Sequence, residues 1–208
     1  MIRTGLLGGS FNPAHGGHRA ISLNAIDALG LDDLWWLVSP GNPLKPAAGM
    51  APLPARLASA RAMARRAPIR ATAIEARLRT RYTVDTLAKL RRRYPRRRFI
   101  WLMGADNLAD FHRWHRWREI ARTVPIAVIV RPGYDRAART APVMSWFRRF
   151  VRPETQARNW TNWRLPALVM LVTRPDQTSA TAIRARDPYW HHRFSPRALR
   201  DSVSRRLV

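Results

Sequence analysis

Two histidines stand three positions apart in a glycine-rich segment near the start of the chain. The segment spans residues 8–18 and reads GGSFNPAHGGH, which places His15 and His18 at the start of an amphipathic stretch. Residues three apart lie about one helical turn apart, so both imidazoles can face the same side. Imidazoles beside the exposed N–H groups of a helix N-terminus suit a phosphate whose negative charge grows in a transition state. The segment therefore predicts phosphate chemistry.

Two other interpretations of this segment are weaker. The histidines could simply cap a helix, or they could bind zinc, but no third zinc ligand lies at a familiar spacing. The segment also differs from the two common phosphate-binding loops, because it contains neither Gly-x-Gly-x-x-Gly nor Gly-Lys-Ser/Thr.

A second polar segment, residues 178–184, reads TSATAIR and by itself is typical of an ordinary capped helix.

Short apolar runs alternate with amphipathic stretches along the chain. The runs predict strands at residues 2–7, 34–38, 69–73, 99–103, 126–130 and 167–172, and their continuous apolar character is typical of strands buried on both faces. Helical spacing of apolar residues predicts helices over residues 17–29, 53–67 and 83–94. This alternation predicts an α/β fold, a Rossmann-like doubly wound parallel sheet with right-handed crossovers. Ligands bind such sheets just beyond the carboxyl ends of the strands.

The 208 residues are enough for one domain, and we expect a single domain over residues 1–208. Residues 134–166 are rich in Arg, Trp and Pro and predict an irregular insertion or helical excursion. Residues 179–208 predict a C-terminal helical portion. Its last helix is expected to run from Ser195 as N-cap and Pro196 as first residue to about Leu207.

The composition restricts the possible partners and chemistry. The net charge of +25 and the sequence pI near 12.0 predict attraction to polyanions: nucleic acid, an anionic membrane or phosphorylated small molecules. The chain has no cysteine, which excludes disulfides, thiolate metal sites and thiol nucleophiles. Residues 1–10 lack the apolar region of a secretory signal, and the apolar runs are far shorter than a membrane span. We therefore expect a cytoplasmic protein.

The two polar segments resemble the paired signatures of the nucleotidyltransferase superfamily. Residues 9–18 resemble Gly-x-Phe-Asp-Pro-x-His-x-Gly-His, with Asn12 in the position of the aspartate. Residues 178–184 resemble Ile-Ser-Ser-Thr-x-Ile-Arg, although Thr178 and Ala180 depart from that pattern. Members of the superfamily move a nucleoside monophosphate group from a nucleoside triphosphate to a phosphate or a similar acceptor.

Segments in the middle of the chain narrow the resemblance to the nicotinate mononucleotide adenylyltransferase family. They are RYTVDTL at residues 81–87, GADNL at residues 104–108, Trp114, and RPGY at residues 131–134. The resemblance runs from Gly5 to about Arg186. It implies transfer of the adenylyl group of ATP to nicotinate mononucleotide, giving deamido-NAD and pyrophosphate. Magnesium is implied as a cofactor bound through the ATP phosphates, with no metal ligand from the protein.

The resemblance also implies roles for individual residues. His15, His18 and Arg184 are the expected catalytic residues, because they would contact the phosphates. The expected ATP-binding residues are Gly8, Gly9, Ser10, Phe11, Gly104, Asp106, Arg131, Ser179 and Thr181. The expected acceptor-binding residues are Lys45, Thr83, Trp114 and His115. Lys45 lies in a segment resembling a Pro-x-x-x-Pro-His-Lys loop, in which Leu44 replaces the usual histidine.

Several alternatives stay open at this point. Trp117 rivals Trp114 as the ring that stacks on the pyridine, and a sister enzyme could use another acceptor such as phosphopantetheine. Arginines interleaved with tryptophans over residues 144–164 also fit a nucleic-acid-binding protein, although we expect no specific nucleic-acid partner and no membrane partner. The oligomeric state is undetermined. We expect solvated surface at His112, His191, His192 and the arginines of residues 91–98.

Overall fold

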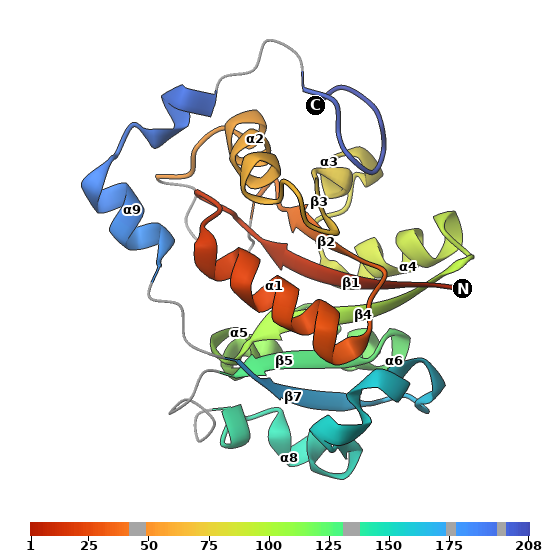
Figure 1. The fold of residues 1–208 in the computed structure, drawn as a ribbon. Coiled ribbons are helices and arrows are strands. Elements are labelled where there is room, and N and C mark those ends of the chain that lie inside the picture. Colours follow the sequence, from red (N-terminus) through yellow and green to blue (C-terminus); the bar gives the residue numbers. More distant parts are fainter. Residues whose placement is uncertain (42–48, 131–137, 174–177, 195–198) are drawn as a thin grey trace.

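The computed structural model describes residues 1–41, 49–130, 138–173, 178–194 and 199–208. Its centre is one seven-stranded sheet with the strand order β3-β2-β1-β4-β5-β7-β6, in which every paired strand is parallel (Figure 1). The strands are β1 (Ile2–Gly9), β2 (Asp33–Val38), β3 (Ile69–Thr72), β4 (Arg97–Gly104), β5 (Ile126–Val130), β6 (Val151–Arg152) and β7 (Leu168–Val172). The predicted doubly wound parallel sheet is confirmed. Only the short strand β6 was not predicted.

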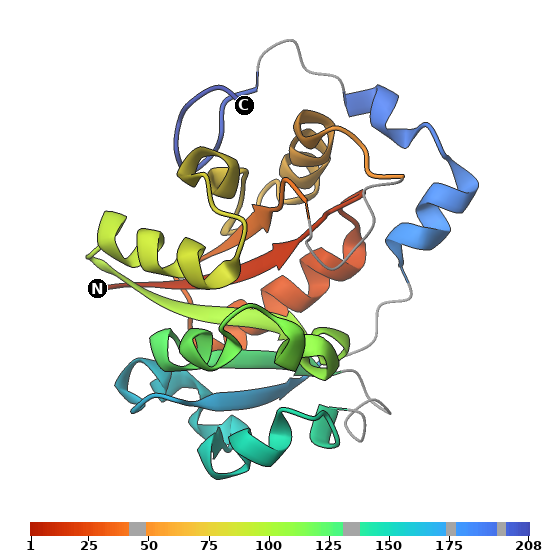
Figure 2. The same ribbon diagram turned by 180° about the vertical axis from the view of Figure 1, so that it is seen from behind.

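Helices cover both faces of the sheet, as the front and back views show (Figures 1 and 2). On one face, α1 (Gly16–Leu29), α2 (Leu53–Met63) and the 3-10 helix η3 (Glu154–Asn162) contribute to one hydrophobic core. The other face is covered by α3 (Ile74–Leu78), α4 (Thr83–Arg93), α5 (Ala105–Asp110), α6 (Trp117–Thr123) and α8 (Met144–Phe147). Shorter elements are η1 (Phe111–Arg113), η2 (Arg148–Phe150), α9 (Ala180–Arg186) and η4 (Trp190–Phe194).

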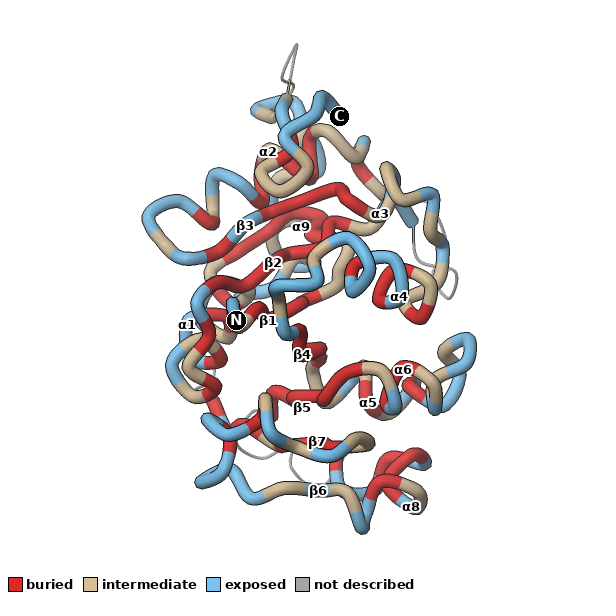
Figure 3. Tube along the Cα trace, turned by 90° about the vertical axis from the view of Figure 1, so that its right-hand side faces the viewer, coloured by how far each residue is buried: buried red, intermediate tan, exposed pale blue. Residues whose placement is uncertain are grey.

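The strand side chains explain why the sheet needs both layers. Along β2, Trp35 belongs to the core under α4, whereas the next residue, Trp36, belongs to the core under α1. Successive side chains of a strand point to opposite faces, so a continuous apolar run requires cover on both sides. Figure 3 shows the resulting pattern, in which the central strands are buried and the helices carry the exposed residues.

The prediction of a C-terminal helix that reaches Leu207 is wrong for residues 199–208. These residues form turns closed by a bridge between Arg200 and Leu207. The expected cap at Ser195 and Pro196 lies outside the described residues. Asp201 explains the different structure. Its buried carboxylate accepts hydrogen bonds from Thr72 Oγ1 at 2.8 Å and from the backbone of Val203 at 2.9 Å. The bond from Thr72 is a tertiary contact and the bond from Val203 closes a local turn, and this side-chain bonding replaces the backbone bonds that a helix would need.

The described part of the segment predicted to be irregular, residues 138–166, packs against the rest of the fold. Residues 138–166 form α8, η2, β6 and η3. Trp160 in η3 is buried, and its indole N–H donates to the carbonyl of Leu29 at 3.1 Å. That carbonyl is in the last turn of α1, where a helix has no internal donor for it. The tryptophan therefore anchors the segment to α1.

One arginine of the predicted solvated run is not on the surface. Arg97 begins β4 and forms an ion pair of 2.7 Å with the buried carboxylate of Asp33. Trp35 also donates its indole N–H to Asp33, at 3.1 Å. The prediction was wrong for Arg97 because β4 starts within the run and brings this residue into the sheet. No helix in the described part of the chain is long and apolar enough to cross a membrane.

Candidate active site

A cavity of about 870 Å³ opens beyond the carboxyl ends of β1 and β4. From β1 the chain continues outward to β2 and β3, and it then returns to β4 on the other side of β1. Adjacent strands whose connections run in opposite directions leave a crevice between them, which is where ligands bind in this class of sheet. Of the expected site residues, the cavity is lined by Gly8, Gly9, Ser10, His15, His18, Thr83, Gly104, Asp106, Trp114 and His115.

The two histidines begin α1 and face each other. His15 is the N-cap residue, and its ring centroid lies 3.9 Å from that of His18. The backbone N–H of His15 donates to Nδ1 of His18 at 3.3 Å. A neutral imidazole that accepts at Nδ1 carries its proton at Nε2. His18 is thus oriented to donate from Nε2 without needing a positive charge.

Phe11 supports this pair from below. Its ring is buried and lies 4.9 Å from the ring of His18 and 5.0 Å from that of Trp36, measured between centroids. Its backbone adopts φ = 47°, a left-handed conformation that is uncommon outside glycine. Phe11 does not line the cavity, so its side chain positions His18.

Asn12 departs from the signature, but it still holds the glycine turn against the residues that precede α2. Its Nδ2 donates to the carbonyl of Gly49 at 2.9 Å, and its Oδ1 accepts from the N–H of Ala51 at 3.2 Å. An amide can donate and accept at once, whereas an ionised carboxylate only accepts. Asparagine therefore makes a contact to Gly49 that an ionised aspartate cannot make.

The two signature segments meet although 172 positions separate their contacting residues. Arg184 Nη1 donates to the carbonyl of Asn12 at 2.7 Å. Gly17 allows the approach, because a Cβ atom there would lie 3.0 Å from the ring of His15 and 3.3 Å from the carbonyl of Thr178. The expected residues Ser179, Thr181 and Arg184 therefore lie beside the histidine turn, although none of them lines the cavity.

The second segment also has its own cap and internal contact. Ser179 is the N-cap of α9, since its Oγ accepts the N–H of Ala182 at 3.1 Å. Arg184 Nη2 donates to Thr181 Oγ1 at 3.3 Å. These bonds give α9 a defined start beside α1.

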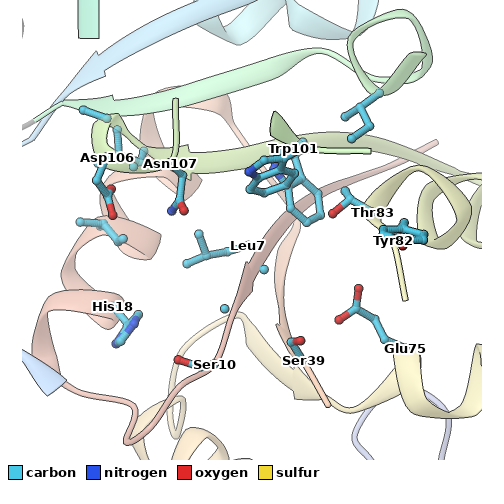
Figure 4. A pocket seen from close by; sticks show the side chains of 18 of the residues that line it. Leu7, Ser10, His18, Ser39, Glu75, Tyr82, Thr83, Trp101, Asp106 and Asn107 are labelled. Carbon is cyan, nitrogen blue, oxygen red and sulfur yellow. The ribbon is translucent and has the colours of Figure 1, made fainter. Parts of the chain in front are cut away.

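The opposite wall begins where β4 ends. Gly104 is the N-cap of α5, and a Cβ atom at that position would collide with the carboxylate of Asp106. Glycine thus leaves room for the Asp106 side chain to turn back toward the end of the strand. Asn107 lines the same wall, and Figure 4 shows these two polar side chains together at one end of the cavity, on the side of His18.

The other end of the cavity is aromatic. Tyr82 stacks on His115 with ring centroids 4.4 Å apart, next to Thr83, which is the first residue of α4. Trp114 lines the cavity, whereas Trp117 does not. The ring of Trp117 instead packs edge-on against Trp146 at 5.2 Å. The geometry therefore favours Trp114 over its rival as the ring that can face a ligand.

Sequence reasoning missed several residues of the cavity wall, including Ser39, Glu75, Trp101 and Arg113. Figure 4 shows Glu75 near Tyr82 and Thr83. Burial raises the pKa of Glu75 to about 7, against the smaller lowering effect of a hydrogen bond from Thr86. Position was the available signal, because Ser39 directly follows β2 and Glu75 lies shortly after β3.

Two expected site residues, Lys45 and Arg131, lie outside the described residues. His112, His191 and His192 do not line the cavity. Among the residues that the structure describes, no group of three or more His, Cys, Asp or Glu side chains is placed to hold a metal ion.

Comparisons with known proteins agree with one another. Residues 6–186 match the model of the cytidylyltransferase-like family. A protein of Erythrobacter litoralis named as a probable nicotinate-nucleotide adenylyltransferase is 62% identical over 207 residues, which cover 100% of this chain and 94% of that protein. A protein of Parvibaculum lavamentivorans with the same name is 53% identical and is covered to 92%, over 89% of this chain.

Solved structures support the fold. The nicotinic acid mononucleotide adenylyltransferase of Plasmodium falciparum, complexed with NaAD, aligns with a TM-score of 0.63 and 14% identity. The alignment covers 89% of this chain and 83% of that one. The same enzyme complexed with APC aligns with a TM-score of 0.61.

Proposed function

Since this chain belongs to the cytidylyltransferase-like family and, within it, to the nicotinate-nucleotide adenylyltransferases, we propose that it joins ATP to nicotinate mononucleotide. The products are deamido-NAD and pyrophosphate, and the reaction is a step of NAD biosynthesis. The observation that carries this proposal is the 2.7 Å contact between Arg184 and the carbonyl of Asn12. This contact joins residues 8–18 to residues 178–184, the two segments that resemble phosphate-binding signatures. They meet beside one end of the cavity, and the other end is aromatic.

The reaction needs no covalent enzyme intermediate. An ionised phosphate oxygen of nicotinate mononucleotide attacks the α-phosphorus of ATP in line with the bond to the β-phosphate. A new P–O bond forms, the Pα–O bond to the β-phosphate breaks, and its electron pair leaves with pyrophosphate. Because the nucleophile arrives ionised, the protein has to hold two polyanions together and stabilise the charge that develops on the bridging oxygen.

His15, His18 and Arg184 supply that stabilisation. His18 donates from Nε2, since its Nδ1 accepts the backbone N–H of His15. Arg184 points its guanidinium at the end of the same turn and can bind a β- or γ-phosphate. Gly8, Gly9 and Ser10 leave the backbone of the turn open to the triphosphate. Ser179 and Thr181 supply hydroxyl and backbone donors at the start of α9, and Phe11 contributes through the turn that it packs under.

The far wall receives the rest of the two nucleotides. Gly104 and Asp106 bind the adenosine ribose, with Asp106 accepting from a hydroxyl group. Trp114 stacks on the pyridine ring, worth about 0.5–1.5 kcal/mol beyond area burial. Thr83 and the backbone near His115 hold the pyridine carboxylate. Backbone donors favour a carboxylate over an amide, which brings donors of its own.

Three contributions rest on the family resemblance alone. Lys45 is proposed to meet the phosphate of the acceptor and Arg131 to contact ATP. Magnesium is proposed to enter as part of the MgATP substrate, because Mg²⁺ keeps several waters and is often bound mainly through substrate phosphates.

Product analysis tests the proposal directly. Purified protein is incubated with ATP and MgCl₂ and with one of three acceptors: nicotinate mononucleotide, its amide, or phosphopantetheine. Products are separated and identified by mass. We expect deamido-NAD and pyrophosphate with the first acceptor and much slower reaction with the other two. Preferred use of phosphopantetheine would replace this function with that of a sister enzyme, and equal use of the amide would overturn the carboxylate contacts near Thr83 and His115.

A further inference from the structure

Arg56 is a buried cation beneath the candidate active site. It lies in α2, on the side of the sheet covered by α1, and only 1% of its surface is exposed. No carboxylate in the described part of the chain forms an ion pair with it. Burial lowers the pKa of Arg56, but a guanidinium remains protonated in proteins. An isolated buried charge is costly, so its surroundings must compensate it.

Backbone carbonyls supply that compensation. Arg56 Nε donates to the carbonyl of Ala51 at 2.8 Å, and Nη1 donates to the carbonyls of Ser10 at 2.8 Å and Ser39 at 2.7 Å. Nη2 lies 3.4 Å from the carbonyl of Pro40. The carbonyls come from three separate stretches of chain, and a planar fork of N–H groups can reach all of them at once.

Two of these stretches form the wall of the cavity. Ser10 belongs to the turn after β1 that leads to the histidines, and Ser39 directly follows β2. Both residues line the cavity, whereas Arg56 does not. Figure 4 shows Ser10 and Ser39 along the same edge of the cavity, with His18 beyond Ser10. The guanidinium therefore ties together two neighbouring turns that form one edge of the cavity.

We propose that Arg56 is a positioning residue of the reaction, which holds the turns after β1 and β2 at a fixed separation and adds a positive charge behind the phosphate-binding turn. The inference rests on the proposed function for its choice of ligand. A bound polyphosphate complements this charge, with which no carboxylate of the described residues forms an ion pair. Lysine cannot replace arginine here, because a single ammonium cannot span carbonyls from separate turns with fixed directions.

Two variants and one control test the role. Arg56→Lys keeps the charge but loses the fork, and Arg56→Met loses both. The control is Arg65→Met, an exposed arginine that follows the same helix. Steady-state kcat and KM are measured for ATP and for nicotinate mononucleotide at a temperature where each variant is folded by circular dichroism. The rise in Tm caused by inorganic tripolyphosphate is measured separately, as a binding readout that needs no turnover.

We expect Arg56→Lys to lower kcat by about 10²-fold, because displacement of reacting groups by about 1 Å costs that much. We also expect it to lose most of the tripolyphosphate shift, while Arg65→Met changes kcat by no more than about twofold. A folded Arg56→Lys variant with normal kcat, normal KM and a normal tripolyphosphate shift would overturn the inference. If wild type forms no dinucleotide but is stabilised by tripolyphosphate, the proposed function fails, and the loss of that shift in the variants still tests Arg56.

Discussion

Among single residues, the histidine pair has a structural role in capping α1, and the same geometry suits the chemical role that we propose for it. His15 caps α1 and donates its backbone N–H to His18, which fixes the proton of His18 at the outer nitrogen. Helix capping and the phosphate binding that we propose for these histidines therefore use the same arrangement, and they are not competing explanations. Phe11 completes it by packing under the ring of His18.

The first residue-scale prediction concerns His18. His18→Ala removes a donor aimed at the phosphates, so we expect kcat to fall by about 10²- to 10³-fold. Steady-state kinetics at saturating ATP measures the change, and circular dichroism checks that the fold is kept. His112→Ala is the matched control, because His112 is exposed and does not line the cavity. Near-normal turnover of His18→Ala would remove His18 from the catalytic residues.

The second residue-scale prediction concerns Glu75, whose pKa in the folded protein, about 7, lies above the ordinary value of 4.5. Between these two pH values the folded protein holds a proton that the unfolded chain releases. The free energy of unfolding therefore decreases as pH rises from 4.5 to 7, by up to about 3 kcal/mol from this group. Glu75→Gln does not titrate and should lose this decrease.

Urea unfolding at several pH values from 4.5 to 8 measures the free energy of unfolding of wild type and of Glu75→Gln. The variant should gain stability relative to wild type as pH rises, and the difference should level off above pH 7. Glu119→Gln, at a more exposed position, serves as control. A difference between Glu75→Gln and wild type that does not change with pH would show that the pKa of Glu75 is the same in the folded protein and in the unfolded chain.

The sequence predicted those site residues that stand at a recognisable spacing. It missed residues that only the folding of the chain brings to the cavity. Spacing predicted that His15 and His18 can face the same side, and their ring centroids lie 3.9 Å apart. For Glu75 the sequence offered only its position shortly after β3, because a single carboxylate has no spacing pattern that marks it as part of a cavity. It also could not distinguish Trp114 from Trp117, since both lie in one aromatic stretch and only packing separates them.

At the level of helices and strands, continuous apolar runs located the six predicted strands within two residues at each end. Strands buried on both faces have a strong signal, because nearly every side chain must be apolar. Short elements such as α3 and β6 have too few residues for a period to appear. The C-terminal helix was predicted from its capping residues, and tertiary hydrogen bonds from Thr72 and Ala73 to Asp201 override such local preferences.

Asp201 holds the C-terminal turns against the end of β3, and we predict that the stability of the protein depends on it. Its carboxylate accepts the hydroxyl of Thr72 and the N–H of Ala73, which together join the end of β3 to the C-terminal turns. Asp201→Ala leaves these buried donors without a partner, which should lower the free energy of unfolding by about 1–3 kcal/mol. Chemical denaturation measures the loss.

The control is Asp187→Ala, which removes one exposed ion pair with Arg193 and should cost no more than about 1 kcal/mol. Equal stability losses in the two variants would mean that the C-terminal turns do not depend on Asp201.

At the scale of the whole molecule, the parallel sheet brings segments from both ends of the chain to one edge. Alternating strands and helices predicted the class of fold and the edge at which ligands bind. They did not predict the strand order, in which β7 lies between β5 and β6. That order depends on how residues 138–166 pack, and their polar and aromatic composition has no regular period.

The charge of the whole molecule leads to a further prediction. A net charge of +25 attracts any polyanion, so the protein should bind DNA without sequence preference and with a steep dependence on salt. We expect a Kd of about 10⁻⁴–10⁻⁶ M at physiological salt, in the usual non-specific range. Filter binding to two duplexes of unrelated sequence over a range of salt measures it. Nanomolar binding at physiological salt would indicate a nucleic-acid function beside the enzymatic one.

The stereochemical course at the α-phosphorus shows whether the reaction is one in-line displacement. We propose that the cavity aligns the acceptor phosphate for a single in-line attack on ATP, with no covalent bond to the protein. One diastereomer of ATP with sulfur on the α-phosphate is used with nicotinate mononucleotide, and the configuration of the dinucleotide product is determined. A single displacement predicts inversion at phosphorus. Retention would require two displacements through a bond to the enzyme and would rule out the direct attack of nicotinate mononucleotide on ATP.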